Sequence, residues 1–536
     1  MSILGINKES KELERIYIGD SLETYSVFSR IPSKLISDEL KEMNDGLSTS
    51  DITSEFGVIS KYYDIYRYGV GVVPEGTNGD FEGSMLRFKK AANLIKREAR
   101  FLFCETPDIK AIIEGKEKTK DKDINENIAL CNTLIQKVIK RTMFEDKLLK
   151  AAKDCFIGKR VALVANFNYE TGISLNFLKS TEFLYQTNDD NPDVLDTFVA
   201  FIVTNESSSN EVKRIFKKKF KMDYIEDEET GEEKKMCFLE EVLYDGNGSL
   251  IEIVREYAPT DLDRIPAVVI LNDGLTGDTN GISEIGELMG GEKYYTKLSN
   301  GDMDAERKEM AQIRYTVDMD PNSTQNLSVR PGSYWDLQSD MNKDNKSVQV
   351  GTLSSSMNYT NSVDMTLKRI EQNMHEVLDM PYINLESMSG VITSGKGLEA
   401  VYWPLIVRTK EKMKVWGPAL SYIFKLILDA ATIYEDITLM YIEKPIVPMG
   451  YDVEILQNSP LPRNEESEKV LDMQEVNAQV RSKKSYMKKW QELTDNEANE
   501  ELEQIAYERQ LLEDSFQSDI YVEDEAEVTV DDISDE

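Results

Sequence analysis

The amino-acid sequence predicts an α+β protein of several domains, and three observations support this class. Short apolar runs rich in β-branched and aromatic residues, bounded by Gly, Asn and Asp, occupy 160–168, 173–187 and 197–204, as β-strands do. Long stretches with helical periodicity dominate the second half, at 282–313 and 354–380. The length of 536 residues exceeds what one hydrophobic core usually serves, so two to four domains are expected.

The first half is expected to carry further strands. The segments "KMCFLEEVLY" and "LIEIVREYA" are typical of a β-hairpin, with "DGNG" (245–248) as its turn. The run "IPAVVILN" (265–272) is expected to be a last apolar strand. Residues 1–56 are polar and mixed, which favours a peripheral arm with short helices. Nothing in this half has the pattern of a catalytic site.

The second half is expected to be built on long helices. The stretch 282–313 is helical but weakened by Gly290, Gly291 and Gly301. The stretch 354–380 stops before Pro381. Its apolar residues follow a 4, 3, 4, 3 spacing that places them on one side of a helix: Val363, Leu367, Ile370, Met374 and Val377.

A further long helix is expected after residue 397, with kinks at Pro404 and at Gly417-Pro418. Beyond it, 461–516 is a charged helical region. The residues after 516 are rich in acids and hold no Lys or Arg, which is typical of a disordered tail.

The charge balance is the outlying feature of the composition. The chain has 98 acidic and 63 basic residues, a formal net charge of −35. Such acidity argues against wrapping nucleic acid through clustered Lys and Arg. It is compatible with a surface that repels DNA and lets it pass, although solubility alone also explains it.

Cysteine and histidine usage excludes several kinds of site. The four cysteines form no C-x-x-C pair, and His375 is the single histidine. Zinc and redox motifs are therefore not expected, and a Ser-His-Asp site is disfavoured. We find no apolar run of about 18 residues and no signal-peptide start, so we expect a soluble protein made in a cytosol, without membrane contact.

One short segment comes close to a phosphate-binding P-loop. Residues 390–397 read "GVITSGKG", one residue away from G-x-x-x-x-G-K-[ST]. Gly397 stands where the metal-binding hydroxyl is needed, and the preceding "DMPYINLESMS" is no buried apolar strand. A flexible glycine loop between two helices explains the segment better than a nucleotide site.

Three other places are candidate metal sites, and each has a simpler interpretation. Asp302 and Asp304 with Glu306 lie on a charged helix, which favours a solvated face. The loop "LNDGLTGDTNG" (271–281) lacks the spacing and terminal Glu of a calcium-binding EF-hand. His375 is expected to be a polar or interface residue. The sequence therefore predicts no metal site and no cofactor.

The order of elements resembles the portal proteins of tailed double-stranded DNA bacteriophages, of the type common in phages of Gram-positive bacteria. Three stretches carry the resemblance over roughly 59–515. The first is "YYDIYRYGVGVV" followed by "AANLIKREARFLFCETPDI", and the second is "RIPAVVILNDGLTGDTNGISEIGELMGGEKYYTKLSNGDMDAE". The third is "LKRIEQNMHEVLDMPYINLESMSGVITSGKGLEAVYWPLIVRTKEKM".

The resemblance implies a multidomain portal fold with a wing, long stem helices, a small clip and a helical crown, assembled as a ring. The borders it implies are an N-terminal arm 1–56, wing 57–280, stem helix 281–314, clip 315–352, second stem helix 353–380, tunnel loop 381–397, kinked helix and wing return 398–460, crown 461–516 and acidic disordered tail 517–536.

The family also implies what the protein does and with what. The ring, usually of twelve subunits, would stand at one capsid vertex of the virion after assembly in the host cytoplasm. Double-stranded DNA would pass through it without sequence specificity during packaging and ejection. Its partners would be the terminase large subunit, a head–tail adaptor, and the major capsid and scaffolding proteins. No catalytic residue is expected.

The site residues follow from the same resemblance. Those expected at the channel in the tunnel loop are Asn384, Glu386, Ser387, Ser389, Thr393, Ser394 and Lys396. Lys293, Lys297 and Asp302 of the first stem helix are further channel candidates. Tyr334, Trp335 and Asp336 are expected to dock partners at the clip. The alternatives are a P-loop packaging ATPase and an adaptor ring that does not translocate DNA.

Overall fold

The structure is a computed structural model of the whole chain. The residues that it describes are 31–43, 49–71, 83–113, 122–205, 212–226, 233–275, 280–310, 313–320, 349–353, 359–383, 395–458, 465–491, 493 and 495–524. The chain divides into two compact units. Unit 1 comprises Met1–Met388 and Ala400–Pro460, and unit 2 comprises Ser389–Glu399 and Leu461–Glu536.

Unit 1 mixes sheets and helices, which confirms the α+β class. Its strands are β1 (Asp108–Ile113), β2 (Arg160–Asn168), β3 (Gly172–Lys179), β4 (Phe183–Thr187), β5 (Leu195–Asn205), β6 (Val212–Glu226), β7 (Glu233–Asp245), β8 (Leu250–Pro259), β9 (Ala267–Leu271), β10 (Ile313–Val317), β11 (Gln349–Leu353) and β12 (Tyr451–Leu456). They form four antiparallel sheets. The largest has the order β4-β5-β6-β7-β8, and a second has the order β3-β2-β9.

The predicted hairpin is confirmed as β7 and β8, which pair antiparallel. The central strand β6 was not predicted. Burying the lysines of β6 would cost folding free energy if their ammonium groups had no acidic partner. Lys217 bonds to Glu39 at 2.6 Å, Lys218 to Glu241 at 2.7 Å, and Lys219 to Glu42. These acids come from other elements, so a local pattern does not reveal the strand.

Unit 1 also contains helices, some of which pack against these sheets and others against one another. They are α2 (Ser33–Met43), α3 (Thr49–Tyr68), α4 (Lys90–Phe103), α5 (Lys122–Arg141), α6 (Phe144–Gly158), α7 (Glu284–Met310), α9 (Thr360–Val377), α11 (Gly395–Ile433) and α12 (Glu435–Thr438). The main core contains residues of the helices α3, α4, α5, α6, α7, α9 and α11 and of the strands β2 and β3. The helix α11 continues through Pro404 and Pro418.

The prediction of a peripheral arm over 1–56 is wrong for its described part. Helix α2 and the first half of α3 contribute to a core with strands of the large sheet. Leu35, Ile36 and Phe56 are buried there against Val199 and Phe201. The apolar residues of α2 recur at helical spacing and cover the sheet, so this segment is an integral layer of unit 1.

Unit 2 is helical. It contains α13 (Glu465–Asn477), α14 (Lys483–Trp490) and α15 (Asp495–Asp524). Asp472 connects the first two helices, because its carboxylate accepts hydrogen bonds from Lys489 at 2.8 Å and Trp490 Nε1 at 2.6 Å. Helix α15 extends over 517–524, which the acid-rich composition predicts to be disordered. No Gly or Pro interrupts this stretch, so helix propensity alone gives no stop signal there.

Candidate functional site

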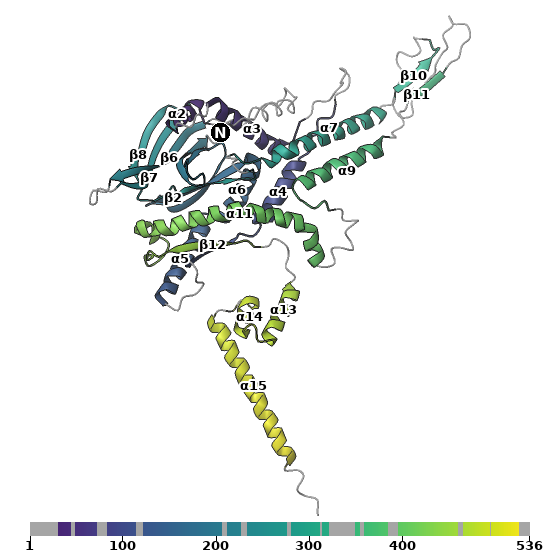
Figure 1. Cartoon of the computed structure of the whole chain (residues 1–536). Helices are drawn as coiled ribbons and strands as arrows, with labels where there is room; N and C mark the ends of the chain where they lie inside the picture. Colours follow the sequence, from purple (N-terminus) through teal and green to yellow (C-terminus); the bar gives the residue numbers. More distant parts are fainter. Residues whose placement is uncertain are drawn as a thin grey trace, which may run out of the picture. The chain divides into compact units, whose positions relative to one another are not determined.

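The candidate site is the pair of long helices α7 and α9, called here the α7–α9 pair. The two helices lie side by side and lead to the hairpin of β10 and β11 (Figure 1). The predicted seam of α9 faces α7 and the core: Met374 is buried, and Val363, Leu367, Ile370 and Val377 are half-buried. The helical period in the sequence therefore identified the packed face correctly.

Helix α7 is continuous from Glu284 to Met310, so its glycines do not break it. Gly291 is placed against α9. A β-carbon at this position would lie 2.8 Å from Met374 Cγ and 3.9 Å from Ile370 Cγ2. Gly290 and Gly301 have no such neighbour within 4 Å. One of the three glycines therefore allows the close approach of the two helices.

A second face of α7 holds the segment that precedes α4. Asn300 accepts a hydrogen bond from the Leu86 N–H at 3.1 Å and donates one to the Leu86 carbonyl at 2.9 Å. Asp304 accepts the Ser84 N–H at 2.8 Å. Glu292, two turns before Asn300, accepts the Ala91 N–H at 2.9 Å. These three side chains recur at helical spacing, so one face of α7 fixes the chain along its length.

Glu292 is a buried carboxyl in this face. Burial raises its pKa to about 7, although the N–H groups of Ala91 and Val70 favour the charged form and oppose the shift. Because α4 begins at Lys90, the carboxyl also lies at the positive end of that helix. Lys90 in turn bonds to Glu371 of α9 at 2.8 Å, so the first turn of α4 contacts both helices of the pair.

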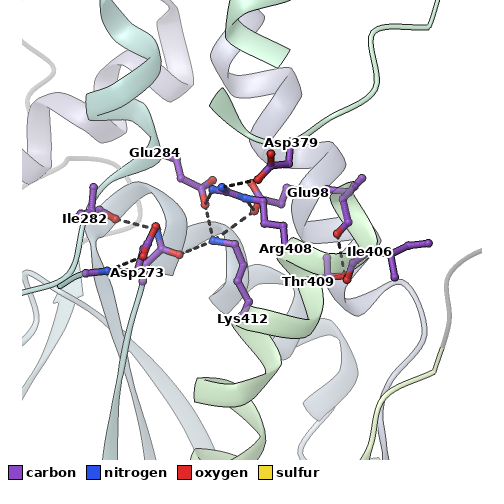
Figure 2. A network of polar contacts seen from close by, with 12 residues as sticks. Glu98, Asp273, Ile282, Glu284, Asp379, Ile406, Arg408, Thr409 and Lys412 are labelled. Atoms are coloured by element: carbon purple, nitrogen blue, oxygen red, sulfur yellow. Dashed lines mark hydrogen bonds and ion pairs between the residues drawn. The ribbon is translucent and has the colours of Figure 1, made fainter. Parts of the chain in front are cut away.

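The base of the pair is held by a buried charge network (Figure 2). Arg408 Nε of α11 donates to Glu98 of α4 at 2.8 Å, and its Nη2 donates to Glu284 of α7 at 3.2 Å. Lys412, one turn further along α11, donates to Glu284 at 2.6 Å. Arg408 Nη1 also lies 3.7 Å from Asp379, just after α9. The two cations of α11 therefore contact three other segments: α4, α7 and the residues just after α9.

The two carboxyls of this network differ in their proton affinity. Burial would raise the pKa of Glu98, but the charges of Lys412 and Arg408 outweigh burial and lower it. Burial and the neighbouring Glu98 raise the pKa of Glu284. No sequence pattern predicted this network. A usable sign was Glu98 itself, an acid among the apolar positions Ile95, Ala99 and Leu102 on the buried face of α4.

An open groove lies along the α7–α9 pair. It has a volume of about 850 Å³ and is lined by Gly291, Tyr294, Leu298, Gly301, Val363 and Ile370. Tyr294 is 66% exposed at its rim. Lys297, Asp302 and Arg369 add charge to the lining. One carboxylate oxygen of Asp302 is buried and makes no hydrogen bond within the described residues.

The structure places only some of the predicted site residues. Lys293 is half-buried, Lys297 is exposed, and Lys297 and Asp302 share the groove. Lys396 lies in the first turn of α11, but its side chain is outside the described residues. The other predicted residues of the tunnel loop and clip also lie outside: Asn384, Glu386, Ser387, Ser389, Thr393, Ser394, Tyr334, Trp335 and Asp336.

Two of the candidate metal ligands, Asp304 and His375, make contacts within the fold. Asp304 holds Ser84 as described above and lies 3.6 Å from Arg307. His375 is buried, with Nδ1 2.8 Å from the Glu371 carbonyl and its ring edge-on to Tyr382. In the part of the chain that the structure describes, no group of three or more potential ligands could hold a metal ion. No described helix is long and apolar enough to cross a membrane.

The comparisons with known proteins agree with the resemblance noted in the sequence. Residues 290–512 match the family described as phage portal protein, SPP1 Gp6-like. The match begins within α7 and includes the groove, the β10–β11 hairpin, α9, α11 and most of unit 2. No curated protein matches the chain. The match covers residues 290–512 of the 536 and supports a tailed phage portal protein.

Proposed function

We infer that this protein forms the homo-oligomeric ring, expected to hold twelve subunits, through which genomic DNA is packaged into and ejected from a phage capsid. The family is structural and non-enzymatic, and it implies an oligomeric ring associated with the capsid. The ring would first dock the terminase large subunit and later the head–tail adaptor. Tyr334, Trp335 and Asp336 are proposed to lie at that docking surface.

The observation that carries this proposal is the apolar groove of the α7–α9 pair. A groove of about 850 Å³ with mostly apolar walls offers a neighbouring chain a place to bury its own apolar side chains. A ring is built from heterologous contacts, in which one surface of each copy meets a different surface of the next. The groove is therefore proposed to receive the neighbouring subunit. The buried Asp302 oxygen would find its partner there.

The net charge of −35 supports a channel through which DNA moves without adhering. Repeated around a ring, such acidity disfavours long-lived contacts with phosphates. Lys297, Lys293 and Lys396 are proposed to supply positive charges near the passing DNA. The proposed narrowest part of the channel is the tunnel loop of 381–397.

The test is the particle mass and shape of the purified full-length chain. We expect rings with a central hole in negative-stain images, and a matching mass in mass photometry. The variant Tyr294→Asp/Thr366→Asp places one acid on each wall of the groove and should give folded monomers. The control Leu439→Asp/Met440→Asp adds the same charges at exposed apolar positions after α12 and should still form rings.

A monodisperse monomer at all protein and salt concentrations would contradict the proposal. Two further measurements address the alternatives. ATP hydrolysis that is abolished in Lys396→Ala would indicate a P-loop motor. Deletion of the protein from the phage should give capsids without DNA, whereas DNA-filled capsids without tails would indicate an adaptor ring.

A further inference from the structure

We propose that α4 carries a second DNA-contacting surface, which binds the phosphate backbone of double-stranded DNA through Lys89, Lys96, Arg97 and Arg100. These four residues are called the basic stripe. The inference rests on the proposed function, because that function brings the protein into contact with DNA. It adds a surface that belongs to a single chain and does not need the ring.

The stripe is unusual for this chain. Residues 87–100, "RFKKAANLIKREAR", hold six Arg or Lys and one acid, in a protein whose acids outnumber its bases by 98 to 63. That acid, Glu98, is fully buried and bonded to Arg408. It therefore neutralises charge in the core and leaves the surface of α4 basic.

Helix geometry places the stripe on one side of α4. Lys89, Lys96 and Arg100 are separated by seven and four residues, and Arg97 is adjacent to this line. The opposite side of the helix is buried, with Leu94, Ile95, Ala99 and Leu102 in the core. From Lys89 to Arg100 the helix rises about 16 Å, which equals the axial rise of four to five phosphates of one strand at about 3.4 Å each.

The cations of the stripe are available for a ligand. Lys89, Arg97 and Arg100 are exposed and Lys96 is half-buried. Within the described residues, none of the four forms an ion pair. Lys90 is not counted, because it is bonded to Glu371. The Lys96 ammonium lies 5.6 Å from the centre of the Tyr66 ring of α3, which holds it at the surface.

A fifth cation extends the basic surface. Lys153 lies on α6, which packs against α4. Burial, and then the charges of Arg100 and Lys96, lower the pKa of Lys153. The charge of Lys153 is therefore within electrostatic reach of Arg100 and Lys96, with Asp146 and Asp154 acting in the opposite direction. Clustering like charges costs folding free energy, and a bound polyanion would offset that cost.

The composition of the stripe favours a nucleic acid over a protein partner. Protein–protein interfaces are depleted of Lys and depend on buried aromatic or apolar anchors. The exposed side of α4 offers Asn93 and cations, while Phe101 is already stacked on Tyr402 with ring centres 5.8 Å apart. Contacts between Lys or Arg and phosphates need no such anchor, and they are independent of base sequence.

The experiment measures binding of a fluorescein-labelled 30-base-pair duplex of mixed sequence, by anisotropy, at 50 to 200 mM NaCl. Each protein is made in the Tyr294→Asp/Thr366→Asp background, so that DNA cannot bind by threading a ring. We expect Arg97→Glu/Arg100→Glu to weaken binding at least tenfold. The slope of log K against log salt should become shallower by about 2, near one unit for each phosphate that the variant no longer neutralises.

The matched control is Lys410→Glu/Lys414→Glu, two exposed lysines one turn apart on α11 that carry the same charge reversal. The control should keep most of the affinity. Equal affinity of the stripe variant and its parent would overturn the proposal, as would an equal decrease in the control. No binding of the duplex by the parent at 50 mM NaCl would also overturn it.

Two more outcomes distinguish DNA binding by the basic stripe from binding of an acidic protein and from formation of the ring. If poly-L-glutamate bound and the stripe variant failed to bind it while keeping DNA affinity, the partner would be an acidic protein and the proposal would be wrong. Rings of the otherwise unmodified chain are scored separately by mass photometry. Stripe-dependent DNA binding without any rings would support the stripe and contradict the proposed portal ring.

Discussion

Gly291 of α7 faces Met374 of α9 so closely that a β-carbon at position 291 would lie 2.8 Å from Met374 Cγ. Met374 is 2% exposed and is enclosed by the core. The neighbouring Gly290 has nothing within 4 Å of the same position. Of these two adjacent glycines, packing requires glycine at position 291 and not at position 290, so they make a matched pair for mutation.

The first prediction concerns this pair. Gly290→Ala should raise the free energy of unfolding by roughly 0.5–1 kcal/mol, because alanine favours helix and the site is open. Gly291→Ala has the same gain, but the added methyl group overpacks Met374 at a typical cost of about 1–3 kcal/mol. We expect its urea midpoint to fall below that of the parent. Equal stabilisation by both substitutions would contradict the packing described here.

The second prediction concerns the charge network. Arg408→Met leaves Glu98 and Glu284 buried with Lys412 as their remaining cation. Removing one partner of a buried ion pair costs about 3–5 kcal/mol, so the urea midpoint should fall strongly. The exposed Lys410→Met on the same helix is the control and should change stability by less than about 0.5 kcal/mol.

A second variant separates charge from packing in this network. Glu98→Gln/Arg408→Met removes one charge of each sign. The double variant should be more stable than Arg408→Met alone, because fewer unpaired carboxylates are left in the core. If the double variant were as unstable as the sum of the two single variants, the network would contribute through side-chain shape alone.

The third prediction concerns pH. Burial raises the pKa of Glu292 to about 7 from its ordinary 4.5, so the folded state binds this proton more tightly than the unfolded state. The resulting stability is present below pH 4.5 and is lost as the pH rises through 7. Glu292→Gln does not titrate. Relative to it, the parent should lose about 2 to 3 kcal/mol between pH 4.5 and 7, measured by urea denaturation. Parallel pH profiles would show that this carboxyl does not titrate in that range.

The fourth prediction concerns the segment held along α7. Asn300→Ala removes both hydrogen bonds to Leu86. Their removal should cost about 1–3 kcal/mol locally and speed amide hydrogen exchange in peptides covering 83–89, with little change in α6. Glu306→Ala, an exposed position on the same helix, should leave that exchange rate unchanged. Faster exchange throughout unit 1 would instead mean that the whole unit is destabilised.

Strand prediction succeeded where a segment carries its own pattern. The run 160–168 became β2, and the "DGNG" turn separates β7 from β8, because alternation and turn residues are local properties. Strand β6 and the layer formed by α2 escaped prediction. Lys217 is buried because Glu39 of α2 lies 2.6 Å away, and no pattern near residue 217 contains that information.

The α+β class, the apolar face of α9 and the resemblance to phage portal proteins were all predictable from the sequence, because helical period and motif order are patterns along the chain. Which charges meet depends on the folded structure. Glu98, Glu284 and Arg408 are up to 310 residues apart yet share hydrogen bonds in one core. It also decided that Gly291 is a contact point and that the α7–α9 pair has an open groove, since both depend on how two separate helices approach each other.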